Sequence, residues 1–189
     1  MRLALAAVLT AGLAVAIPSA QSNMARAEKY TAFAVDISNM APRANASTVD
    51  LTISRWSTDT ERDQLLSVLR DKGQDALLSA LQKLPVVGYI NTPGSLKYDL
   101  HFAQQKEGAD GGKMVFLMTD RYVGAWEAVN RPRTVDYPFM LLQLELDKAG
   151  NGVGKASLYT KITQAADGTI ELENFSSQPV MLNQVRKVQ

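Results

Sequence analysis

The chain has 189 residues, contains no cysteine and carries a net charge of +1, from 20 lysines and arginines against 19 aspartates and glutamates. The absence of cysteine excludes disulfides, thiolate metal ligands and a thiol nucleophile. A near-neutral chain without a basic run gives no electrostatic reason to expect nucleic acid as a partner. A chain of this length suits one domain that is held together by one buried core.

The first 27 residues have the pattern of a cleaved secretory signal peptide. Arg2 supplies a positive charge, and residues 3–17 follow without any charged side chain. This apolar run is shorter than the roughly 20 residues that a membrane-spanning helix needs. Cleavage is expected after Ala27, because Ala25 and Ala27 place small residues where a signal peptidase requires them. Cleavage after Ala20 is the alternative.

Cleavage after Ala27 would leave residues 28–189, which we expect to form a single α+β domain. It would remove Arg2 and Arg26 but no acidic residue, so the net charge would change from +1 to −1. No transmembrane segment would remain. Because secreted proteins without disulfides are common in bacterial envelopes, we expect a periplasmic or secreted bacterial protein.

Alternating apolar and polar residues predict strands along most of the chain. In one of them, Leu100 and Phe102 are expected on the same buried face. Residues 113–119 are continuously apolar in their middle, which is typical of a central strand covered on both faces. The pattern predicts about seven to nine mainly antiparallel strands, in a sheet that can curl into a partly closed barrel. Strands are expected at residues 30–38, 49–54, 96–102, 113–119, 140–146, 156–162, 170–174 and 180–188.

A helical hairpin is expected between two of these strands. Thr58 and Glu61 have the spacing of a capping box, which satisfies backbone N–H groups at the start of a helix. A leucine-rich stretch follows and stops at Gly73, a residue suited to the turn that ends a helix. A second helix is expected over residues 74–84, before Pro85. The hairpin is expected to cover one face or one end of the sheet.

The most chemically varied segment is residues 120–138, which lies between two predicted strands. Long ordered connections of this kind often carry binding sites. The candidate ligand-binding residues are Trp126, Arg131, Arg133 and Tyr137, because guanidinium groups bind carboxylates and aromatic faces bind rings or sugars. A structural role is the alternative, in which Arg131 or Arg133 pairs with an acidic residue of the loop and Trp126 covers the end of the core.

His101 is the only histidine in the chain, and Asp99 is expected beside it on the polar face of the same strand. A histidine and an aspartate side by side can form a general base and its orienting partner. A single histidine without cysteines does not supply the usual zinc ligands, and no nucleophile elbow accompanies it. We therefore expect neither a metal site nor a cofactor.

Four stretches of the chain resemble a group of exported bacterial proteins that have no assigned function. These are RWSTDTERDQLL at residues 55–66, VGYINTPGSLKYDLHFA at 87–103, WEAVNRPRTVDYPFMLLQLEL at 126–146 and GTIELENFSSQPVMLNQVR at 168–186. The resemblance extends over about residues 30–188 and implies export and a single domain. It implies no activity, cofactor or catalytic residue.

Three hypotheses of function follow from these observations. The first is a non-enzymatic envelope protein that binds a small ligand or a partner protein through residues 120–138. The second is a metal-independent hydrolase that uses His101 and Asp99. The third is a structural or assembly subunit of the cell envelope, which would expose an apolar patch or an unpaired sheet edge.

Overall fold

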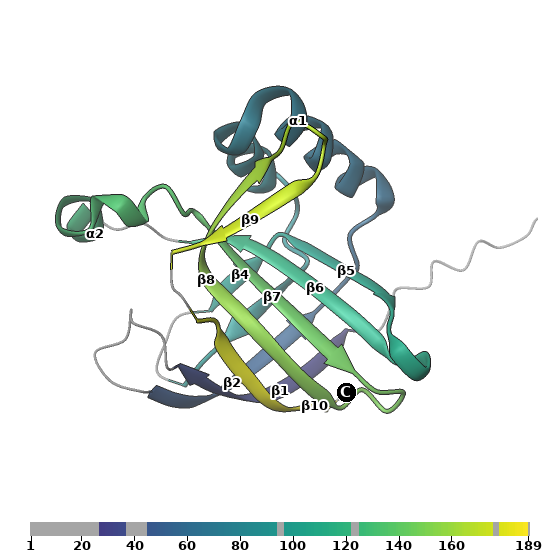
Figure 1. The fold of residues 1–189 in the computed structure, drawn as a ribbon. Helices are drawn as coiled ribbons and strands as arrows, with labels where there is room; N and C mark the ends of the chain where they lie inside the picture. The colour runs from purple at the N-terminus through teal and green to yellow at the C-terminus, as the bar shows by residue number, and fades with distance from the viewer. Residues whose placement is uncertain (1–26, 37–44, 94–96, 122–124, 176–177, 189) are drawn as a thin grey trace, which may run out of the picture.

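The computed structural model describes residues 27–36, 45–93, 97–121, 125–175 and 178–188 (Figure 1). The predicted signal peptide lies outside these ranges up to residue 26, so its cleavage stays a prediction. Within the ranges described, no helix combines the length and the apolar character needed to cross a membrane.

The described residues contain ten strands, all paired antiparallel in one sheet. The strands are β1 (Glu28–Asp36), β2 (Asn45–Ile53), β3 (Gly88–Asn91), β4 (Tyr98–Leu100), β5 (Phe102–Glu107), β6 (Lys113–Asp120), β7 (Phe139–Leu146), β8 (Gly152–Gln164), β9 (Ile170–Asn174) and β10 (Val180–Lys187). Their order is β4-β3-β2-β1-β10-β8-β7-β6-β5, and β9 pairs with the C-terminal part of β8. The predicted α+β class is confirmed, although the alternation pattern did not predict β3 and reached only the first residue of β5.

The helix α1 (Asp59–Leu81) contains the predicted hairpin. The Thr58 side chain accepts a hydrogen bond from the backbone N–H of Glu61, and the Glu61 carboxylate accepts one from the backbone N–H of Thr58. Gly73 has φ 77° and ψ −170°, which breaks the helix into two segments. The capping box and the break are therefore both confirmed. The helix α2 (Ala125–Asn130) is one short turn that stands away from the sheet (Figure 1), and η1 (Ala109–Gly111) and η2 (Pro132–Thr134) are single 3₁₀ turns.

The sheet curls, but its ladder of paired strands does not close into a barrel. Its two edge strands, β4 and β5, follow each other in the chain and are separated only by His101. The Thr119 hydroxyl of β6 donates to the carbonyl of Asp99 at 2.5 Å, and the His101 N–H donates to the carbonyl of Met118 at 3.2 Å. One bent stretch of chain thus lies against both ends of the sheet.

This bend contradicts the prediction that Leu100 and Phe102 share one face. Leu100 and Ala103 are fully buried on the inner face, whereas Phe102 packs with the cluster on the outer face. The alternation changes phase at His101, because the strand leaves one partner there and joins another. Alternation alone cannot reveal this change of face, because Phe102 is apolar as expected but packs against the outer cluster and not against the inner one.

Two apolar clusters hold the fold together. The inner face of the curled sheet is filled by side chains from most strands, including Tyr30, Leu51 and Leu144. A second cluster lies on the outer face, where leucines of α1 pack against Phe139 and Ile162. Helix α1 lies over this outer face together with β9 (Figure 1). The strands between them are therefore apolar on both faces.

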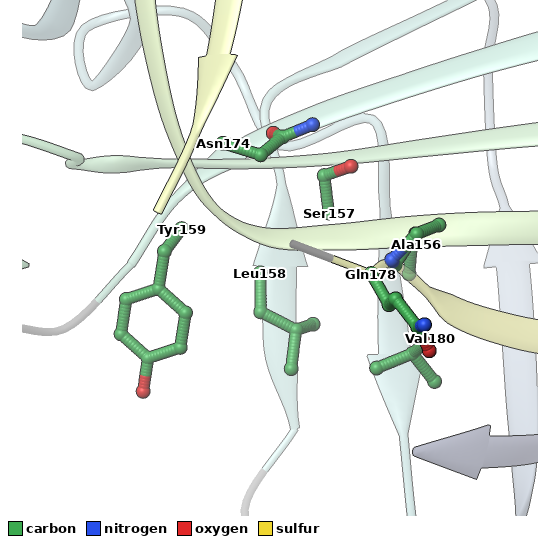
Figure 2. Close-up of a pocket in the computed structure, with 8 residues that line it drawn as sticks. Ala156, Ser157, Leu158, Tyr159, Asn174, Gln178 and Val180 are labelled. Atoms are coloured by element: carbon green, nitrogen blue, oxygen red, sulfur yellow. The ribbon is translucent and has the colours of Figure 1, made fainter. Parts of the chain in front are cut away.

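A bulge in β8 directs the end of that strand toward α1. Phe139 of β7 pairs with Thr160, but Leu141 pairs with Ser157, so β8 has one extra residue between these pairs. Figure 2 shows the result: Leu158 and Tyr159 point to the same side of the strand, whereas Ser157 points to the other side, toward Asn174. Beyond the bulge, Ile162 joins the outer cluster.

Glu61 couples the start of α1 to pH. The pKa of its carboxyl falls from 4.5 to about 2, chiefly because the Arg55 guanidinium donates two hydrogen bonds to it at 2.8 and 2.9 Å, and also because Thr58 donates its N–H. A lowered folded-state pKa contributes stability above pH 4.5 that is lost as pH falls toward 2. We expect Glu61→Gln to lower the free energy of unfolding by about 1–2 kcal/mol at neutral pH.

Urea denaturation across this pH range measures the effect. The difference between wild type and Glu61→Gln should shrink as the solution is acidified through the interval between the two pKa values. Glu107→Gln, at the exposed end of β5, is the control and should leave stability within about 0.5 kcal/mol of wild type. A difference that persists unchanged at low pH would contradict this role of the Glu61 charge.

Candidate functional site

The largest hollow described lies between α1 and the outer face of strands β5 to β9, and we call it the groove. Its volume is about 570 Å³, within the range of roughly 300–1,000 Å³ that is common for small-molecule sites. Both its helical side and its sheet side consist mainly of apolar side chains. The groove is therefore the best candidate for a functional site.

The sheet forms the floor of the groove in two rows of side chains that run across the strands. The first row is apolar for three strands, and the second row, two residues further along each strand, is largely polar. The register gives the first row as Phe102, Met118, Leu141 and Ser157, and the second as Gln104, Phe116, Gln143 and Lys155. The floor thus changes from apolar to polar along the strand direction.

Three large apolar side chains line the groove while remaining open to solvent. Leu66 of α1 is 37% exposed, and Ile170 and Leu172 of β9 are 38% and 55% exposed. Leu65, Leu69 and Leu77 of α1 also line the groove but are buried. Apolar side chains gathered in a concave surface are typical of a binding site, whereas scattered exposed ones are ordinary.

The polar end of the groove carries two lysines. The Lys106 ammonium lies over the Phe116 ring, 6.0 Å from its centre, and this brings it back toward the row that contains Lys155. In the described part of the chain, neither lysine forms a salt bridge. Arg62 also lines the groove, but its guanidinium is paired with Asp59 and Asp63 at 2.8 and 2.9 Å.

Gln74 fixes the position of α1 over the sheet. Directly after the break at Gly73, its side-chain oxygen accepts a hydrogen bond from the backbone N–H of Ile162 at 2.8 Å. Its side-chain nitrogen donates to the carbonyl of Asp136 at 3.1 Å. One amide therefore joins the helix break both to β8 and to the loop that precedes β7.

Two smaller hollows are less suited to a ligand. One, of about 210 Å³, opens at the inner face of the sheet beside Val49, Ile90 and Tyr98, and it falls below the usual size range. The other lies at the β8 bulge shown in Figure 2 and measures about 10 Å³, which is room for no more than one water. The groove remains the strongest candidate.

The loop of residues 120–138 is organised by Arg121. Its buried guanidinium donates to the carbonyls of Tyr137 and Thr134 at 2.7 and 2.5 Å and to the Glu127 carboxylate at 2.9 Å, and it lies 4.4 Å from the centre of the Tyr159 ring. The hydrogen bond from Arg121 holds the pKa of the Glu127 carboxyl below its usual value. The arginine that pairs with an acidic residue of this loop is therefore Arg121, which the sequence analysis did not single out.

Of the four predicted ligand-binding residues, Arg131, Arg133 and Tyr137 do not line the groove. Arg131 and Arg133 are exposed, and the side chain of Trp126 lies outside the described part of the structure. The Tyr137 hydroxyl donates to the Glu173 carboxylate at 2.6 Å, which raises the pKa of Tyr137. Binding by these residues stays a prediction.

His101 faces Asp120 and not Asp99. Its Nδ1 lies 3.1 Å from the carbonyl of Leu84, and because a carbonyl can only accept, Nδ1 carries the hydrogen of that bond. Its Nε2 lies 4.0 Å from Asp120, whose other carboxylate oxygen accepts a hydrogen bond from Gln82. His101 lines neither the groove nor the inner hollow, so it has no neighbouring ligand cavity of those described.

The described residues contain no group of three or more histidine, aspartate and glutamate side chains that could hold a metal ion. Comparison with protein-family models, with curated proteins and with solved structures finds no match to this chain. The resemblance to exported bacterial proteins therefore stays a prediction, and function has to be argued from the geometry of the groove.

The groove was missed at the sequence level, although two signals for it are present. Residues 114–118 are apolar on both faces of their strand, and the leucines of α1 supply an apolar surface to cover one of these faces. What no local pattern contains is that β9, far along the chain, folds back beside α1. The side walls of the groove are thus set by long-range pairing.

Arg121 gives a test of the structural role of its loop. We expect Arg121→Ala to lower the free energy of unfolding by about 2–3 kcal/mol, because it leaves the Glu127 carboxylate and two carbonyls without their charged donor. The measurement is urea denaturation followed by tryptophan fluorescence. Arg133→Ala, which removes an exposed guanidinium from the same loop, should change stability by less than about 0.5 kcal/mol. Equal effects of both substitutions would contradict the assignment.

Proposed function

We propose that this protein is a non-enzymatic binding domain that takes a small ligand with an apolar body into the groove under α1. The observation that carries the proposal is the set of large apolar side chains, Leu66, Ile170 and Leu172, that remain solvent-exposed inside a hollow of ligand size. Removing apolar surface from water stabilises by roughly 25 cal/mol per Å². A ligand that covers these side chains gains this free energy without rearranging the sheet.

The lining of the groove supports binding rather than hydrolysis. The described residues that line it include no aspartate, glutamate or histidine. These are the side chains that most often act as general acids and bases. His101, the residue of the alternative hydrolase hypothesis, points instead to Leu84 and Asp120.

We also propose that the domain acts outside the cytoplasm, in the bacterial periplasm or beyond. The charge-free apolar run of residues 3–17 and the small residues Ala25 and Ala27 support this location. A cysteine-free domain with a large antiparallel sheet is compatible with it. In such a location the ligand would be a compound of the envelope or of the surroundings of the cell.

An uncharged apolar fluorophore tests the groove directly. We expect Nile red to bind the wild-type protein with saturable enhancement of its fluorescence, because the groove transfers it from water to an apolar surface. The double variant Leu66→Gln/Leu172→Gln should bind it about tenfold more weakly or worse, since both side chains lose their apolar contact with the dye. Fluorescence titration gives both dissociation constants.

Val129→Gln is the matched control. Val129 is 78% exposed on α2 and lies outside the lining of the groove, so its replacement removes exposed apolar surface elsewhere. This variant should bind Nile red as wild type does, and circular dichroism should show that all the variants remain folded. If the groove variants bind the dye as tightly as wild type, the proposed site is wrong.

A further inference from the structure

We infer that the ligand of the groove is a long-chain fatty acid, with its carboxylate at Lys106 and Lys155 and its acyl chain along the apolar floor toward Leu172. This inference rests on the proposed function, because it names the class of molecule that the same groove would bind. It follows from three features of the groove: its length, the polarity change along its floor and the charge at one end.

The length of the groove suits one extended chain. The path starts at the Gln143–Lys155 pair and follows β7 for four residues to the Phe139–Thr160 pair. It then follows β8 for two residues to Ile162, which pairs with Leu172. At about 3.4 Å per strand residue, these steps add up to about 20 Å. The long dimension of the site therefore runs from a lysine to a group of apolar side chains.

The two lysines can reach one small anion. Lys155 is on β8, and the Lys106 ammonium lies over Phe116 of β6, in the same row across the sheet. Lys106 itself belongs to β5, so β6 and β7 separate the two lysine backbones by about 14 Å. The Lys106 side chain extends over β6, whose backbone lies about 10 Å from that of β8. Long flexible side chains from both positions can converge on a carboxylate between them.

One acidic residue, Glu145, also lies at this end of the groove, in the same row across the sheet as Lys106. Its carboxylate accepts a hydrogen bond from Gln143 at 3.2 Å. No salt bridge joins Glu145 to either lysine in the part of the chain that the structure describes. Two unpaired cations beside an apolar channel complement a molecule with one anionic head and one apolar tail.

The shape of the site favours a single free amphiphile over the surface of a bilayer. The apolar side chains face into a space between α1 and the sheet, and buried Leu65 and Leu69 form part of its helical wall. A bilayer would require them to face outward on an open surface. A free acyl chain can enter the groove, whereas a membrane surface cannot.

Displacement of Nile red by dodecanoate and by dodecanol tests the inference, at concentrations below those at which the acid forms micelles. Wild type should bind dodecanoate more tightly than dodecanol. The variant Lys106→Gln/Lys155→Gln should bind dodecanoate about fivefold more weakly, because two exposed charge interactions are lost, and should bind dodecanol unchanged. Lengthening the acid should tighten binding about fourfold per methylene until the groove is filled.

The control variant is Lys72→Gln/Lys83→Gln, which removes two exposed lysines that lie outside the lining of the groove. It has the same net charge as the test variant and should bind dodecanoate as wild type does. If the acid and the alcohol bind equally and the substitution of Lys106 and Lys155 has no effect, the assignment of the carboxylate to these lysines is wrong. The proposal that the groove binds an apolar ligand would still be supported by Nile red binding.

Two further outcomes would also overturn the inference. Failure of both compounds to displace Nile red would mean that the groove does not take an alkyl chain. Binding to vesicles of anionic phospholipid, without displacement of Nile red by the free acid, would assign the lysines to a membrane surface. The proposed function fails separately, by the absence of Nile red binding to wild type.

Discussion

The structure depends on one constraint: strands β5 to β8 carry apolar side chains on both faces. The inner face is satisfied within the curled sheet, where Val115, Leu117 and Leu144 are almost completely buried. The outer face needs a second cover, and α1 supplies it with leucines that pack against Phe139 and Ile162. Because the helix breaks at Gly73 and its two segments cover only part of this face, an apolar hollow remains between them and the sheet.

The elements that sequence alone predicted are those whose cause is local. The capping box needs only Thr58 and Glu61, three residues apart, and the helix break needs only the positive φ of Gly73, which glycine adopts without a steric penalty. Most strand positions other than β3 and β5 follow from alternation, and the α+β class follows from the number of strands and the helical insertion. The strand expected at residues 156–162 in fact begins at Gly152, where a side chain would collide with the Glu145 carbonyl.

The features that the sequence could not predict depend on contacts between residues that are far apart in the chain. His101 separates β4 from β5, which lie at opposite ends of the sheet, so the alternation continues through a point where the chain changes partner. The residues of the predicted loop site were chosen by composition, but the residue that organises the loop is Arg121, through contacts with Glu127, Thr134 and Tyr159. The groove has the same origin, since Leu66 and Leu172 meet through folding and not through any sequence motif.

The groove also links ligand binding to the stability of the fold. The hydrogen bonds of Gln74 attach α1 to β8 and to the loop before β7. The leucines of α1 add apolar contacts with Phe139 and Ile162. A ligand that fills this space adds apolar contacts between α1, β9 and the sheet, and only the folded chain brings these three together. Any ligand that binds the native state alone stabilises it in proportion to the logarithm of its concentration over its dissociation constant. A ligand in the groove would therefore stabilise the packing of α1 and β9 on the sheet.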